Sequence, residues 1–133
     1  MPRETDMRRF VCLALKPLDA NPVENAVVPG YPDVEFIGGT VELKSLPKWP
    51  VRPETPVKVD HFTPAQRGWL LRRAARGGMT WLLLRVGKTW LLFNGAVAAD
   101  IVGRVPQDQL REAAHVVWES KPSRFALRKE LEV

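Results

Sequence analysis

The residues with the clearest chemical potential are Asp33, Glu35, Glu42 and Lys44, which lie close together in the sequence. Between them, the glycines at positions 38 and 39 favour a tight turn that joins two short strands. With this turn, the predicted register places Asp33 opposite Lys44 and Glu35 opposite Glu42. Since side chains alternate along a strand, one face of the hairpin carries these four charged residues. The other face carries Val34, Phe36, Val41 and Leu43.

Two interpretations of the charged face remain open at this point. Carboxylates that oppose one another destabilise a strand pair. A divalent cation would remove the repulsion, because hard cations take oxygen ligands from clustered carboxylates. Alternatively, the face is solvated and holds a cross-strand ion pair between Asp33 and Lys44, worth at most about 1 kcal/mol.

The length and composition of the whole chain indicate what kind of protein contains this hairpin. Its 133 residues suffice for one domain with its own core, which we place at residues 1–120, followed by a charged tail at 121–133. Lys and Arg number 20 against 15 acidic residues, an excess that favours a polyanionic partner such as nucleic acid. A single cysteine, Cys12, and two histidines give neither an intramolecular disulfide nor a zinc pattern. Without a signal peptide or a membrane-spanning apolar run, we expect a cytoplasmic protein with no membrane partner.

Hydrophobic periodicity predicts the elements that hold the hairpin. Listed in order, they are a helix over 3–16, a strand over 23–28, the hairpin, a helix from 64 to about 76, a second hairpin over 80–86 and 89–93, a short helix or loop over 96–101, and a helix from Pro106 whose apolar stripe reaches Val117 and Trp118. The strands of the second hairpin are continuously apolar, which is typical of strands covered on both faces.

The helix that begins after Thr63 has a clear start and two interpretations of its surface. Thr63 suits the N-cap, and Gln66 completes a capping box, which by itself explains Gln66. Gln66 could also reach the charged hairpin face. Leu70, Leu71 and Ala74 form the expected apolar side, and the opposite arc carries Trp69, Arg72, Arg73 and Arg76. This arc could contact phosphates or could be a solvated helix face.

The segment over 45–62 is rich in proline, with a proline at every third position from 47 to 56. That period is typical of a polyproline II turn. Lys48, Trp49, Arg52 and Lys58 lie within the segment. A stiff basic arm could follow a nucleic-acid backbone, with Trp49 stacked on a base. The alternative is a rigid connector with Trp49 packed against the core.

Together these motifs resemble a known enzyme family. Pro32-Asp33, followed after eight residues by Glu42-Leu43-Lys44, resembles the PD-(D/E)xK signature of metal-dependent nucleases. Gly30 before the Pro-Asp pair, the basic segment, and the Thr63–Gln66 helix start add to the likeness. The order over residues 3–95 is similar to that of small phage-type nucleases related to the VRR-NUC group and to Holliday junction resolvases.

The resemblance implies a fold and a site. The fold is an α/β (α+β) restriction-endonuclease-like core, a mixed central sheet flanked by helices in the order α-β-β-β-α-β-β, plus a C-terminal helix. Asp33 and Glu42 would bind Mg²⁺, with the Leu43 carbonyl as a third ligand and Mn²⁺ able to substitute. Lys44 would act on the attacking water, and Gln66 could assist. Further candidate ligands are Glu4, Glu24 and Glu35; for the family's acid on the first helix, this chain offers Glu4 or Asp6.

The expected activity is a Mg²⁺-dependent endodeoxyribonuclease that hydrolyses phosphodiester bonds of branched or structured DNA. A homodimer follows from the resolvase resemblance, because paired cuts on two strands call for two sites. If the chain is phage-encoded, it would act in the host cytoplasm. Nucleic-acid contacts are expected from Lys48, Trp49, Arg52, Lys58, Arg72, Arg73 and Arg76. The alternatives are a nicking or restriction-like nuclease, or a non-catalytic nucleic-acid-binding module on the same fold.

Overall fold

A mixed β-sheet forms the centre of the protein in a computed structural model that describes residues 4–24 and 27–132. Within these residues the sheet has six strands in the order β1 to β6, and β3 and β4 are the one parallel pair. The elements are α1 (Glu4–Ala14), the 3-10 helix η1 (Lys16–Leu18), β1 (Asn21–Pro22), β2 (Val34–Phe36), β3 (Gly39–Leu46), α2 (Pro64–Ala75), β4 (Thr80–Val86), β5 (Thr89–Asn94), α3 (Gly95–Ile101), α4 (Gln107–Ala113), β6 (Val116–Trp118) and α5 (Arg124–Leu131).

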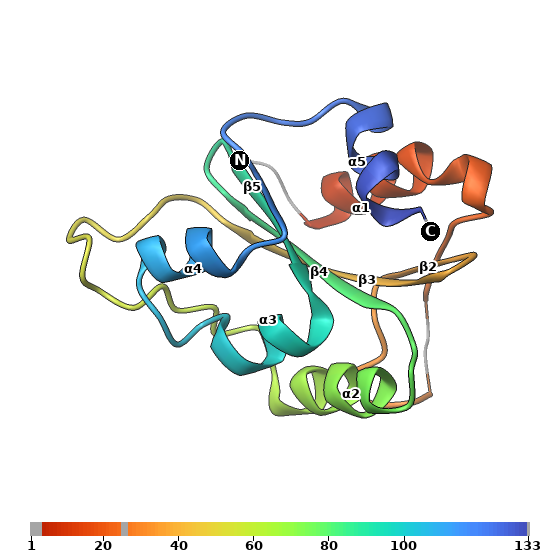
Figure 1. Cartoon of the computed structure of the whole chain (residues 1–133), viewed down its shortest axis with the longest axis horizontal. Helices are drawn as coiled ribbons and strands as arrows, with labels where there is room; N and C mark the ends of the chain where they lie inside the picture. Colours follow the sequence, from red (N-terminus) through yellow and green to blue (C-terminus); the bar gives the residue numbers. More distant parts are fainter. Residues whose placement is uncertain (1–3, 25–26, 133) are drawn as a thin grey trace.

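Helices cover both faces of the sheet (Figure 1). On one face, α1 and α5 pack over a cluster that includes Met7, Val41 and Leu43. On the other face, α2, α3 and α4 lie over a cluster that includes Leu82 and Phe93. Alternate side chains of β4 and β5 belong to the two clusters on opposite faces of the sheet. Both faces of these strands are therefore buried, which explains why their sequences are continuously apolar. No helix in the described ranges is long and apolar enough to cross a membrane.

Several predicted elements are confirmed. The first helix ends at Ala14, before Pro17, and the second hairpin turns at Gly87 as expected. Helix α2 has Thr63 as its N-cap and a complete capping box with Gln66. The order α-β-β-β-α-β-β is present, so the coarse α/β architecture with a mixed sheet agrees with the prediction.

The register of the central hairpin differs from the prediction by two residues. Val34 pairs with Val41 and Phe36 with Gly39, so the turn lies at Ile37 and Gly38. Gly38 adopts a positive φ of 109°, which suits the turn. Gly39 is needed for a different reason, because a Cβ there would lie 2.5 Å from the Met79 carbonyl oxygen. A shift of two residues preserves the facing of every side chain, and the predicted division into two faces therefore stands.

The chain differs from the prediction in three further places. The strand predicted over 23–28 is absent from its described residues, 23–24 and 27–28; β1 instead lies at Asn21–Pro22, and residues 25–26 lie outside the described part. The helix after Pro106 ends at Ala113, and Val117 and Trp118 lie in β6, where β-branched and aromatic residues suit a strand. Residues 121–132, within the predicted tail, include α5, which packs on α1.

Candidate metal-dependent site on the central hairpin

Asp33 and Glu42 come together at the edge of β3. Asp33 lies directly before β2, and one of its carboxylate oxygens accepts a hydrogen bond from the Leu43 amide at 2.8 Å. The β2–β3 pairing ends at Val34 and Val41. Beyond that point, the Asp33 side chain provides the acceptor for the Leu43 amide. A carboxylate thus satisfies a backbone donor that would otherwise be unpaired.

Glu42 is an unusual acid because it is only 2% exposed. Burial is the main reason why the pKa of Glu42 lies well above its usual range, and a hydrogen bond and charge from Asp33 raise it further. Lys44 and a backbone hydrogen bond at Leu43 act in the opposite direction with smaller effect. When no cation is present, the raised pKa favours the protonated form of the Glu42 carboxyl group. A buried carboxyl group beside a half-buried one, with a strongly raised pKa, is typical of functional sites.

Lys44 lies on the same face of β3 as Glu42 and is 3% exposed. Its ammonium donates a hydrogen bond to the carbonyl oxygen of His61 at 2.9 Å and lies 5.9 Å from the centre of the Phe62 ring. The sequence alternative of an Asp33–Lys44 ion pair is wrong, because no such pair forms between these two described residues. The two-residue change in register removes their opposition, and the lysine is held by a carbonyl instead.

Glu4, at the start of α1, reaches this region through His61. A Glu4 carboxylate oxygen lies 2.8 Å from His61 Nε2, and the His61 carbonyl accepts from Lys44. Of the two acids considered on the first helix, Glu4 is thus linked to the site by one intervening residue. Sequence reasoning missed His61, because its contribution is a backbone carbonyl and a ring contact with a helix far away in the chain.

The remaining candidates lie in different surroundings. The Gln66 side chain accepts from the Thr63 amide at 2.9 Å, so it serves the capping box. Glu35 is exposed and accepts from the Tyr31 hydroxyl at 3.3 Å. Glu24 is exposed and lines a hollow beside α1 together with Arg8 and Arg9 among others.

The Pro-rich segment is folded onto the protein at several points. The Thr55 amide donates a hydrogen bond to the Arg52 carbonyl. Val57 is buried, and its amide donates to the Val105 carbonyl. Trp49 is half-buried, packs against the core on the α2 side, and lies under the Arg111 guanidinium at 5.5 Å. This contact supports the connector interpretation for Trp49. Lys48, Arg52 and Lys58 are exposed.

Arg72, Arg73 and the C-cap Arg76 are exposed, whereas the tryptophan among them is not. Trp69 is buried, with its ring 5.1 Å from the Tyr31 ring and 4.5 Å from the Arg73 guanidinium. The prediction that placed Trp69 on the outer arc is wrong, and so is the one that placed Leu71 on the apolar side, since Leu71 is 48% exposed. The loop that carries Tyr31 packs against α2 and covers Trp69, a contact that helical periodicity alone does not contain. Arg72, Arg73 and Arg76 line a hollow of about 370 Å³ with Val28, Tyr31 and Trp69.

The acidic pair can be compared with the needs of a metal ion. Among residues 4–24 and 27–132, no group of three or more His, Cys, Asp and Glu side chains is placed to hold one. Mg²⁺ needs fewer protein ligands, because it is commonly bound by one or two carboxylates while water or substrate phosphates fill the other positions. Asp33 and the buried Glu42 fit that sparse arrangement. No protein-family model matches the chain, and no curated protein matches its sequence significantly.

Proposed function

We propose that the protein is a Mg²⁺-dependent endodeoxyribonuclease of the PD-(D/E)xK type. The observation that carries the proposal is the contact between Asp33 and the buried Glu42, with Lys44 on the same face of β3. A buried carboxyl group such as that of Glu42, next to a second acid, is costly for stability unless something requires it. The αβββαββ order around the hairpin supports a restriction-endonuclease-like fold.

Each residue of the site has a defined task in this proposal. Asp33 and Glu42 hold the Mg²⁺ ion, which when bound supplies charge neutralisation at the phosphate and a more acidic water. Lys44 orients the attacking water and stabilises negative charge on the phosphate. The His61 carbonyl fixes the Lys44 ammonium, and Leu43 fixes the Asp33 carboxylate. Mn²⁺ would occupy the same ligands.

The proposed substrate is branched or otherwise structured DNA, and the proposed active form is a homodimer. Both follow from the resemblance to Holliday junction resolvases. The exposed cations of α2 and of the 48–58 segment lie on either side of the α2 N-terminus in sequence and would contact the DNA backbone.

The test is cleavage of a supercoiled plasmid and of a four-way junction, with and without Mg²⁺. Wild-type protein is compared with Lys44→Met, which keeps the buried stem, and with Lys88→Met as a control at an exposed lysine in the β4–β5 turn. We expect metal-dependent cutting by wild type and the control and a loss of at least about 100-fold in Lys44→Met. Equal cutting by all three proteins would refute the assignment of Lys44.

One observation favours the alternative of a non-catalytic nucleic-acid-binding module. The Lys44 ammonium already donates to the His61 carbonyl, as a purely structural lysine would. In that case the wild-type protein would bind these substrates and cut none of them in Mg²⁺ or Mn²⁺. Binding measured by fluorescence anisotropy on the same DNA molecules separates the two functions.

A further inference from the structure

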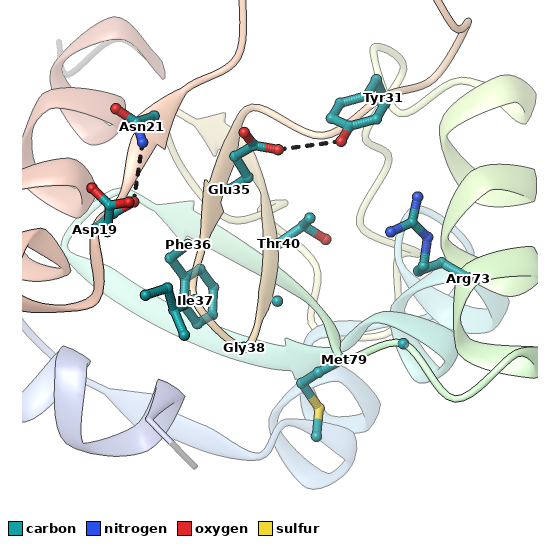
Figure 2. A pocket seen from close by; sticks show the side chains of 12 residues that line it. Asp19, Asn21, Tyr31, Glu35, Phe36, Ile37, Gly38, Thr40, Arg73 and Met79 are labelled. Atoms are coloured by element: carbon teal, nitrogen blue, oxygen red, sulfur yellow. Dashed lines mark hydrogen bonds between the residues drawn. The ribbon is translucent and has the colours of Figure 1, made fainter.

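A hollow of about 450 Å³ lies beside the central hairpin, and neither the metal site nor the core accounts for it. Its lining includes Tyr31, Glu35, Thr40 and Arg73, which come from the loop before β2, from β2, from β3 and from α2 (Figure 2). The volume is within the usual range for sites that bind a small organic group. The hollow is therefore large enough for one nucleoside.

Thr40 is the most informative residue of this lining. It is 6% exposed, and its hydroxyl has no hydrogen-bond partner among the described residues. Buried hydroxyl groups nearly always have a partner, so this unpaired hydroxyl, in a residue that lines the hollow, is a group that a ligand there could satisfy. Figure 2 shows Thr40 on the hairpin with Glu35 on one side and Arg73 of α2 on the other.

The polar groups around Thr40 suit the edge of a nucleobase. The Glu35 carboxylate, which already accepts from the Tyr31 hydroxyl at one oxygen, can accept from an exocyclic amino group with the other. The Thr40 hydroxyl can donate to or accept from a base. The Tyr31 ring lies on the rim and offers an aromatic surface for stacking.

The surroundings of the hollow suit the phosphate of the same nucleotide. Tyr31 and Arg73 also line the neighbouring basic hollow with Arg72 and Arg76. Thr40 precedes Glu42 by two residues on β3 and shares its face, so these two residues are about 7 Å apart along the strand. A nucleotide next to the scissile phosphate would span this distance.

We propose that the hollow around Thr40 binds a single unpaired nucleotide of the substrate strand, with its base against Glu35 and Thr40 and its phosphate on Arg73. This inference rests on the proposed function and specifies its substrate: DNA in which a nucleotide next to the cut has left the base stack. Bases that carry an amino group, such as cytosine, are favoured over thymine by the Glu35 carboxylate.

The test measures binding without cleavage, in EDTA, so that it does not depend on the metal site. The probes are a fluorescent duplex, the same duplex with one unpaired cytosine, and one with an unpaired thymine. We expect wild-type protein to bind the cytosine bulge about tenfold more tightly than the duplex. Thr40→Val and Arg73→Gln should reduce this ratio to near one, and Glu35→Gln should remove the preference for cytosine over thymine.

Thr80→Val is the matched control. Thr80 pairs with Thr40 across the β3–β4 ladder, and its hydroxyl is also buried without a partner among the described residues. Thr80 does not line the hollow. Its hydroxyl instead lies against Gly95, where an added Cβ would be 2.0 Å away. Thr80→Val should keep the wild-type bulge preference, and both valine variants should melt at or above the wild-type temperature.

The outcomes separate this inference from the proposed function. If wild type binds all three probes equally, the nucleotide site is refuted, whatever the cleavage assay gives. If the bulge preference is present and depends on Thr40 and Arg73 while no DNA is cut in Mg²⁺, the nucleotide site stands and the nuclease assignment fails. A loss of preference in Thr80→Val equal to that in Thr40→Val would also overturn the inference, because it would trace to the strand and not to the hollow.

Discussion

The Leu43 amide donates a hydrogen bond of 2.8 Å to the Asp33 carboxylate at the point where the β2–β3 ladder ends. One side chain therefore finishes the strand pairing and supplies an oxygen to the proposed metal site. A single substitution at Asp33 can affect folding, metal binding or both, depending on which property the new side chain keeps.

Two variants at Asp33 are expected to separate these roles. Asp33→Ala leaves the Leu43 amide without its acceptor and should lower the free energy of unfolding by about 1–3 kcal/mol. Asp33→Asn keeps an acceptor oxygen and should lose less stability, yet both variants should lose Mg²⁺-dependent cleavage. Urea denaturation and plasmid cleavage measure the two effects. Equal destabilisation by both variants would contradict the capping role of the carboxylate.

The pH dependence of stability should report on Glu42. Its pKa is raised in the folded state, mainly by burial, so above the ordinary carboxyl pKa of about 4.3 the folded protein holds a proton that the unfolded chain releases. Stability contributed by the protonated group is therefore full at low pH and is lost as pH rises towards the folded pKa. Glu42→Gln cannot titrate and should remove up to about 1.4 kcal/mol per pH unit of this slope.

The measurement is urea denaturation of both proteins in EDTA across pH 5 to 9, roughly the window between the two pKa values. The difference between wild type and Glu42→Gln is the quantity of interest, because other groups titrate equally in both. Added Mg²⁺ should stabilise wild type more at higher pH, since a metal ligand must lose its proton. Parallel curves for the two proteins would rule out a protonated Glu42.

Gly30 is expected to tolerate no side chain. Its φ is +81°, and a Cβ would lie 2.2 Å from the Ala65 carbonyl oxygen in the first turn of α2. Gly77 is the matched control, because its φ is +85° and no heavy atom lies within 4 Å of an added Cβ. Gly77→Ala should cost about 1–2 kcal/mol from the left-handed backbone alone. Gly30→Ala should cost more in thermal unfolding, and similar losses in both would contradict the close contact with α2.

The sequence predicted the face of the hairpin correctly although it placed the turn one residue too late, which changes each cross-strand partner by two residues. Strand side chains alternate with a period of two, so Asp33, Glu42 and Lys44 stay on one face in either register. Local signals were also sufficient to predict the start of α2, because its capping box joins Thr63 and Gln66, which are close in the sequence.

Features that depend on distant segments were not accessible in this way. The contact of Glu4 with His61 joins residues far apart in sequence, and Trp69 is buried because the loop with Tyr31 covers it. The helix predicted after Pro106 was extended through Val117 and Trp118, because an apolar run does not reveal whether it continues a helix or pairs with β5.

The exposed cations should divide into those that contact DNA and those that do not. Arg52 and Lys58 lie in the Pro-rich segment, Arg72 lies on α2 and Arg76 is its C-cap; all four are exposed. If each neutralises a phosphate, each double alanine variant should reduce the slope of log K against log salt by about 1.8 for a duplex. A control that replaces Lys16 and Lys129, both exposed near the ends of α1 and α5, should leave the slope unchanged.

The measurement is a salt titration of anisotropy in EDTA. A normal slope in Arg52→Ala/Lys58→Ala alone would assign the Pro-rich segment to the connector role and leave the DNA path on α2, because Trp49 is already packed against the core.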